Sequence, residues 1–107
     1  MTLRQRQPPL RDPDYLAWLR KQRCACCKQA PPCDAAHLRA TSFVYGKSGG
    51  IGMKPDDRWA LPLKHNHHMA QHAHGNELEW WAAQGVENPF DLCITYYKRY
   101  LLTKGID

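Results

Sequence analysis

The chain has no uninterrupted apolar run long enough to cross a bilayer, and its Met-Thr-Leu-Arg-Gln-Arg start lacks the apolar core of a signal peptide. We therefore expect a cytoplasmic protein that makes no membrane contact. The glycine-rich stretch at residues 45–52 also lacks the Gly-x4-Gly-Lys-Ser/Thr order of a phosphate-binding P-loop. No internal repeat is evident. These absences argue against a membrane protein, a P-loop nucleotidase and a repeat protein.

Cysteine is present in an odd number, which a closed set of disulfides cannot use completely. Four of the five cysteines lie between Cys24 and Cys33. Such crowding in a chain without a secretory signal is typical of metal ligation in a reducing compartment. The sequence therefore favours a metal site over a disulfide framework.

Length and charge limit the architecture and the partner. A chain of 107 residues forms one domain with a small core, for which a bound metal is a common source of stability. Lys and Arg outnumber Asp and Glu by 15 to 10, which favours a polyanionic partner such as DNA. We expect residues 1–11 to form a flexible basic arm, or simply a solvated tail, and residues 12–107 to form a single domain.

Local signals predict helices at both ends of the chain and a hairpin between them, which is an α+β class. Asp12 with Pro13, Asn76, and Asn88 with Pro89 have the form of helix starts, and Asn66 is a further candidate cap for a histidine-bearing helix that Gly75 ends. Apolar alternation predicts a strand at residues 59–63, with residues 34–39 as its partner.

The first chemical signal is a thiol pair, Cys24-x2-Cys27, whose spacing lets both sulfurs bind one zinc ion. Two more ligands are needed. We predict Cys33 and His67, with Cys26 and His65 as alternatives, because a protonated Lys64 cannot bind a metal. A competing interpretation treats Cys33 as a small buried residue without a ligand role.

The second signal is a histidine set. His68 and His72 are one helical turn apart, the spacing that lets two imidazoles bind the same ion. His37 on the predicted hairpin has a side chain suited to act as a general base, and Asp57 is a carboxylate that could orient it or join the metal shell. Together they suggest metal-dependent phosphodiester hydrolysis. Surface histidines without a role are the competing interpretation.

Cations flank these residues and could hold the phosphates of a nucleic acid, although solvated charges look the same in a sequence. The candidates are Arg39, Lys47, Lys54 and Arg58.

The order of these motifs resembles that of HNH, or ββα-metal, nucleases, and most of all the small phage and prophage proteins of the recombination enhancement function type. The matching segments are Asp12-Pro-Asp-Tyr-Leu-Ala-Trp-Leu, Cys24-x2-Cys27, Ala35-Ala-His-Leu38, Gly52-x-Lys-Pro-Asp-Asp57, Pro62-Leu63, His67-His68-x3-His72, Asn76-Glu77 and Trp81. The resemblance implies a treble-clef-like ββα-metal core with a structural zinc, flanking helices and cleavage of single- or double-stranded DNA. It also implies that His37 is the base and that His68 and His72 hold a catalytic magnesium, manganese or zinc ion.

Two departures from the family pattern bear on these expectations. Many HNH sites carry a further metal ligand immediately before the base, where this chain has Ala36, and Lys64 stands where a cysteine is usual. The main alternative is therefore a catalytically inactive, zinc-stabilised module that binds nucleic acid. A third hypothesis, an assembly protein, rests on the aromatic C-terminal segment.

Overall fold

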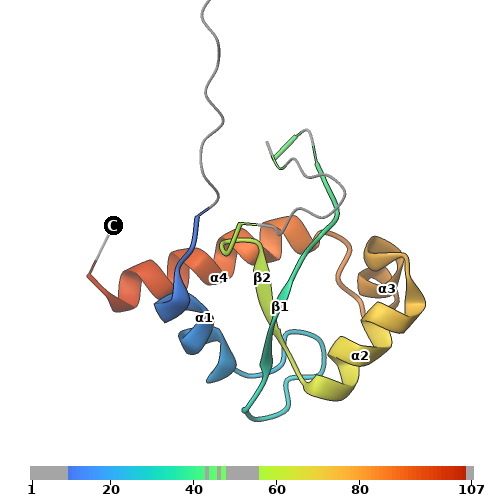
Figure 1. Cartoon of the computed structure of the whole chain (residues 1–107), viewed down its shortest axis with the longest axis horizontal. Coiled ribbons are helices and arrows are strands. Elements are labelled where there is room, and N and C mark those ends of the chain that lie inside the picture. Colours follow the sequence, from blue (N-terminus) through green and yellow to red (C-terminus); the bar gives the residue numbers. More distant parts are fainter. Residues whose placement is uncertain (1–9, 43, 46, 48–55, 106–107) are drawn as a thin grey trace, which may run out of the picture.

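The computed structural model describes residues 10–42, 44–45, 47 and 56–105. Within them the chain forms an α+β structure with a two-stranded sheet and four helices (Figure 1). The order is α1 (Pro13–Arg20), β1 (Asp34–His37), β2 (Ala60–Leu63), α2 (His65–His74), α3 (Glu77–Ala83) and α4 (Pro89–Thr103). The predicted class is confirmed, and so is the hairpin followed directly by the histidine-bearing helix.

Side-chain caps begin three of the helices as the sequence predicts. Asp12, Asn76 and Asn88 each accept a hydrogen bond from the backbone amide three residues later. The prediction that Asn66 caps α2 is wrong. β2 ends at Leu63, so Lys64 is the N-cap and Asn66 lies inside the first turn. Gly75 ends α2 as predicted, with φ +89°, a value that glycine adopts without strain.

The two strands pair in antiparallel fashion, with Asp34 opposite Leu63 and His37 opposite Ala60. β1 ends at His37, two residues earlier than predicted. The reason lies outside the hairpin: the backbone amides of Arg39 and Ala40 donate to the Glu77 carboxylate at the start of α3, at 2.7–3.0 Å. This carboxylate therefore ties the end of β1 to the α2–α3 turn.

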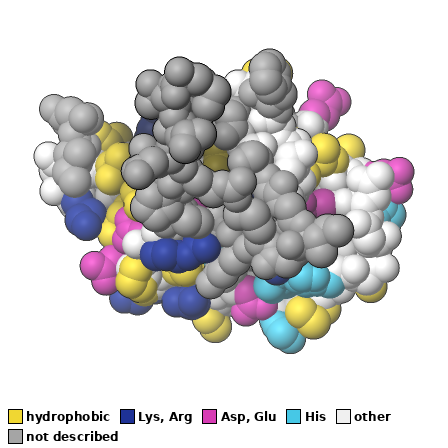
Figure 2. Space-filling view, turned by 45° about the horizontal axis from the view of Figure 1, so that its top comes forward, with side chains coloured by type: hydrophobic (Ala, Val, Ile, Leu, Met, Phe, Trp, Pro, Cys, Tyr) yellow, Lys and Arg dark blue, Asp and Glu magenta, His cyan; other side chains and the backbone are white. Residues whose placement is uncertain are grey.

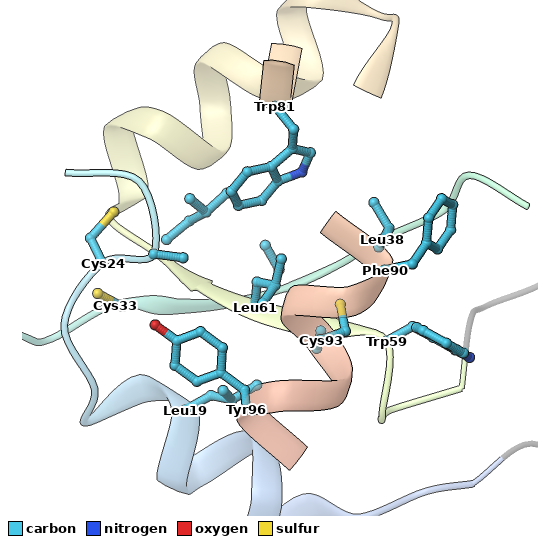
Figure 3. Packing of buried hydrophobic residues seen from close by; sticks show 14 of the residues in the cluster. Leu19, Cys24, Cys33, Leu38, Trp59, Leu61, Trp81, Phe90, Cys93 and Tyr96 are labelled. Atoms are coloured by element: carbon cyan, nitrogen blue, oxygen red, sulfur yellow. The ribbon is translucent and has the colours of Figure 1, made fainter. Parts of the chain in front are cut away.

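The core lies around β2, all of whose residues are buried, with α1, α3 and α4 packed about the hairpin (Figure 3). Leu61 lies between Trp81 of α3 and the α4 side chains, and Leu19 of α1 closes the other end of the cluster. Tyr15 of α1 packs edge-on against Tyr97 of α4, with ring centroids 4.7 Å apart. The helices thus cover the hairpin and leave α2 beside it with much of its surface exposed.

The predicted basic arm at residues 1–11 lies outside the described residues except for its last two positions. Both contact the segment before β2. The Leu10 amide donates to Asp56 Oδ2 at 3.0 Å, the Asp57 amide donates to the Leu10 carbonyl, and the Arg11 guanidinium lies 3.5 Å from Asp57 Oδ1. None of the helices in the described part of the chain is both long and apolar enough to cross a membrane.

Candidate metal centre and histidine site

Helix α2 brings His68 and His72 together on one face. Their Nε2 atoms are 3.1 Å apart and their ring centroids are 4.8 Å apart. The histidines gather at the α2 end of the molecule, beside acidic side chains (Figure 2). Two nitrogens bound to one transition-metal ion are about 2.9 to 3.4 Å apart, given bonds of about 2.0–2.1 Å and angles of about 90–109°. The pair therefore has a separation that suits two ligands of the same ion.

Asp34, the first residue of β1, supports this pair from the hairpin. Its Oδ2 atom lies 2.9 Å from Nδ1 of His68 and 2.8 Å from Nδ1 of His65. Burial raises the pKa of Asp34, but the hydrogen bonds from His68 and His65 lower it, and the net result is a pKa below the usual value. Sequence reasoning missed Asp34, because nothing local to it indicates that α2 will pack there.

Helix α2 runs alongside β1. Its first turns contact Asp34, and near its C-terminal end Gln71 donates to the same Glu77 carboxylate that binds the residues after β1. Side chains alternate along a strand, so Asp34 and Ala36 share a face of β1. Next to His72 lies a hollow of about 540 Å³, whose lining residues are Arg39, Ala40, Gln71, His72, Gly75, Asn76, Glu77 and Leu78.

His37, the candidate base, is paired with Asp57, the candidate carboxylate. His37 Nε2 lies 2.8 Å from Asp57 Oδ1, and the Asp12 amide donates to Asp57 Oδ2 at 2.8 Å. Asp57 is buried; burial raises its pKa, but the hydrogen bonds from His37 and the Asp12 amide bring it below the usual value. Strand alternation places His37 and Asp34 on opposite faces of β1, so the two histidine groups have separate partners.

Three cysteines of the loop between α1 and β1 form a group that could hold a metal ion. The Sγ atoms of Cys24, Cys26 and Cys27 all lie within 4.8 Å of one another, and those of Cys24 and Cys26 are 3.6 Å apart. Burial raises the pKa of Cys24, but backbone N–H donors from Lys64, Cys27 and Cys26 lower it to about 7 overall. A sulfur surrounded by such donors is readily a thiolate, which is the form that binds metals.

The group shares Cys24 and Cys27 with the predicted ligand set and differs from it in three residues. Cys26, an alternative in the sequence analysis, belongs to it, whereas Cys33 and His67 do not. Cys33 is buried at the same end of the core as Cys24 (Figure 3), and burial, with the neighbouring Cys24 sulfur, raises its pKa. The His67 ring faces Trp80 instead, with centroids 6.4 Å apart.

Lys64, which stands where the resemblance leads one to expect a cysteine, still contacts the cysteine loop. Its amide lies 3.4 Å from Cys24 Sγ, and its ammonium group donates to the carbonyls of Ala30 and Pro32. The lysine therefore links the loop to the start of α2 through hydrogen bonds.

The four predicted phosphate-binding cations have different surroundings. Arg39 is exposed and lines the hollow beside His72. Arg58 is exposed, and its guanidinium bonds to Asp56 at 3.3 Å. Lys47 is 5% exposed, and burial lowers its pKa, so the structure does not support the prediction that its ammonium group contacts phosphates. Lys54 lies outside the described residues.

Comparison with known protein families shows which family the chain belongs to. Residues 3–92 match a family described as a protein of unknown function, DUF968, and the chain belongs to that family. The match includes both histidine groups and the cysteine loop.

A curated relative is the uncharacterised protein YdfU of Escherichia coli (strain K12). It is 36% identical to this chain over an alignment of 73 residues, and the alignment covers 61% of this chain and 19% of the relative. The chain thus aligns with about a fifth of the length of that relative. No solved structure matches the chain.

Proposed function

We propose that this protein is a metal-dependent endonuclease of the HNH type that hydrolyses DNA phosphodiester bonds. The observation that carries the proposal is the His68–His72 pair, with 3.1 Å between the two Nε2 atoms, on a helix that follows an antiparallel hairpin. The order of two strands and a histidine-bearing helix agrees with the ββα-metal core that the sequence resemblance implies.

The donor chemistry of the pair fits a divalent ion. Two neutral imidazoles suit manganese, zinc or another transition metal, and the phosphate oxygens of a substrate would supply ligands that also suit magnesium. An ion bound by His68 and His72 would polarise the scissile phosphate and stabilise the negative charge of the leaving oxygen. The protein's part is to hold both Nε2 atoms toward one point.

In this proposal His37 takes a proton from the attacking water. A base needs a fixed ring orientation, which the 2.8 Å contact with Asp57 supplies, while Asp57 is itself held by the Asp12 amide. A carboxylate beside the ring also stabilises the imidazolium that forms when the proton arrives. His37 and Asp34 lie on opposite faces of β1, so the proposal requires the attacking water to reach from the His37 ring, at the end of the strand, to the ion at His68 and His72.

We propose a structural zinc at the cysteine loop. Soft thiolates favour zinc among common divalent ions, and sulfurs bound to one zinc at about 2.3 Å are about 3.8 Å apart in tetrahedral geometry. The 3.6 Å separation of Cys24 and Cys26 is close to that value. Cys24, Cys26 and Cys27 would be three ligands, and Cys33, at the same end of the core, is the nearest remaining thiol for the fourth.

The substrate assignment rests on charge and position. The formal net charge is +5, and exposed Arg39 lines the hollow that includes His72. Glu77 also lines this hollow, but both of its oxygens accept bonds from protein N–H groups, which reduces its repulsion of an anion. A phosphodiester strand is therefore a suitable occupant next to the histidine pair.

One observation favours a second candidate, a catalytically inactive zinc-stabilised module that binds nucleic acid. Among the described residues, three candidate ligands come close enough to hold one ion in the cysteine cluster. His68 and His72 have no third such ligand there. Ala36 offers no ligand on the face of β1 that it shares with Asp34. In this alternative, cations such as Arg39 bind the phosphates and no bond is cut.

The test is a cleavage assay with purified, zinc-loaded protein on supercoiled plasmid and on single-stranded DNA, with magnesium, manganese or zinc added. We expect metal-dependent nicking in the wild type and a loss of about 100-fold or more in His37→Ala, His68→Ala and His72→Ala. His74→Gln is the matched control, because His74 is on the same helix but bonds to Glu79. It should cut like the wild type.

Folding and zinc content are checked for every variant, so that loss of cutting cannot reflect loss of structure. DNA binding is measured in parallel by fluorescence anisotropy. If the folded, zinc-loaded wild type binds both DNA forms and cuts neither with any ion, the nuclease proposal fails and the binding module replaces it.

A further inference from the structure

We infer that Asp34 is a positioning residue that keeps the Nε2 atom of His68 free of a proton and aimed at His72. The inference rests on the proposed function, since it gives the histidine pair its ligand-ready form. Neither the motif spacing nor the sequence resemblance points to Asp34. It follows from a contact between the first residue of β1 and the first turn of α2.

Asp34, His68 and His72 contact one another in that order. Asp34 Oδ2 lies 2.9 Å from His68 Nδ1, and His68 Nε2, on the other side of the same ring, lies 3.1 Å from His72 Nε2. The His68 side chain is 20% exposed, so water competes only weakly for its ring nitrogens. The ring is therefore held from one side by a carboxylate and presented on the other side to His72.

Hydrogen-bond chemistry then sets the tautomer of His68. A carboxylate accepts and cannot donate when ionised, so Nδ1 of His68 must carry the proton in this contact. In a neutral imidazole the proton is on one nitrogen only, which leaves the lone pair of Nε2 available. Without a metal, His72 Nε2–H donates to this lone pair. Were a metal bound, neutral His72 would carry its proton on Nδ1, and both Nε2 lone pairs would be free to hold the ion.

Asp34 acts through His68 and is not placed as a third ligand. Asp34, His68 and His72, all among the described residues, do not offer three ligand atoms, one from each, that lie within 4.8 Å of one another. An outer carboxylate of this kind orients the ligand and increases its basicity, and removing such a group typically weakens metal binding by about 10- to 100-fold.

His65 supplies a matched control, because its Nδ1 atom contacts the same Asp34 oxygen at 2.8 Å. Its side chain is 74% exposed, and it is not part of the proposed metal pair. His65→Gln removes a neighbour of Asp34 while leaving the Asp34–His68 contact in place. Comparing His65→Gln with Asp34→Asn therefore separates the loss of any contact to Asp34 from the loss of its contact with His68.

The experiment uses the full zinc-loaded chain and two readouts that do not depend on cutting. The first is nitrogen-15 NMR of the His68 ring without added manganese, which reports which nitrogen carries the proton. The second is the Kd for manganese, measured by the loss of the free-ion electron paramagnetic resonance signal. We expect Nδ1-protonated His68 in the wild type and in His65→Gln. Asp34→Asn should lose that preference and bind manganese about 10- to 100-fold more weakly.

Two results would overturn the inference: an Nε2-protonated His68 in the wild type, or the same manganese Kd in Asp34→Asn as in the wild type while His68→Ala binds more weakly. Failure of the nuclease proposal looks different. In that case the His68 tautomer still depends on Asp34, but the wild type does not cut DNA. A thermal unfolding curve of Asp34→Asn, matched to the wild type, shows that the fold is retained.

Discussion

At the scale of single residues, the buried hydroxyl of Tyr15 lowers the stability of the folded protein, and Tyr15→Phe would remove it. Its side chain is fully buried, and within the described residues its hydroxyl is the buried side-chain polar atom that has no hydrogen-bond partner. Burial raises the pKa of this hydroxyl, since the charged form is even less favourable there. We expect Tyr15→Phe to increase the free energy of unfolding by about 1 kcal/mol, measured by urea denaturation of zinc-loaded protein.

Tyr97→Phe is the control, and we expect it to change the free energy of unfolding in the opposite direction. The Tyr97 hydroxyl donates to Asp12 Oδ2 at 3.2 Å, so its removal should decrease the free energy of unfolding by about 0.5–1.5 kcal/mol. Equal destabilisation by both substitutions would mean that the Tyr15 hydroxyl also contributes a favourable contact.

At the scale of elements, residues 24–33 of the loop between α1 and β1 contain no helix or strand, so the zinc proposed for its cysteines would be a main source of order there. We expect removal of zinc by a chelator to lower the free energy of unfolding, since a metal that binds only the folded loop stabilises it. Cys26→Ser should weaken zinc binding by about tenfold or more, measured by competition with a chromogenic chelator.

Cys93→Ser is the control, because this thiol is buried on α4 away from the loop cluster. It should retain one zinc per chain even if its stability falls. Unchanged zinc affinity in Cys26→Ser, together with a loss in both Cys33→Ser and His67→Ala, would instead support the ligand set predicted from the sequence.

At the scale of the whole molecule, Asp57 joins segments that are far apart in the chain. Its carboxylate holds His37 on β1 and the Asp12 amide at the start of α1. The pKa of Asp57 is lower in the folded protein than its usual 3.8, so the folded state favours the ionised form. This contribution to stability is fully present above about pH 5 and is lost as the pH falls below 3.8 through the folded pKa.

We expect Asp57→Asn to lower the free energy of unfolding near neutral pH by about 1–3 kcal/mol, because it leaves buried donors with a weaker acceptor. It should also flatten the decline of stability in acid, measured by denaturant unfolding from pH 6 to 2. Asp91→Asn, at an exposed position on α4, is the control and should retain the wild-type slope. An unchanged slope in Asp57→Asn would contradict the assigned role.

Signals that act within a few residues made much of the fold predictable from the sequence. A cap bonds to an amide three residues away, and a proline or glycine restricts its own backbone, so the starts of α1, α3 and α4 and the end of α2 were predicted from short stretches. Apolar alternation likewise indicated the second strand. Asn66 is not the cap of α2, because β2 ends at Leu63 and the helix begins directly after it, with Lys64 as the N-cap.

Spacing along one helix also determined the histidine pair, because residues four apart face the same side. Other features depend on segments that only folding brings together. Asp34 and His68 are 34 positions apart, and Arg39 and Glu77 are 38 apart. Packing likewise decided that Lys47 is buried. The sequence thus determined which groups are present and the local turns that carry them, whereas the tertiary structure decided their partners, because hydrogen bonds and burial depend on distance in space.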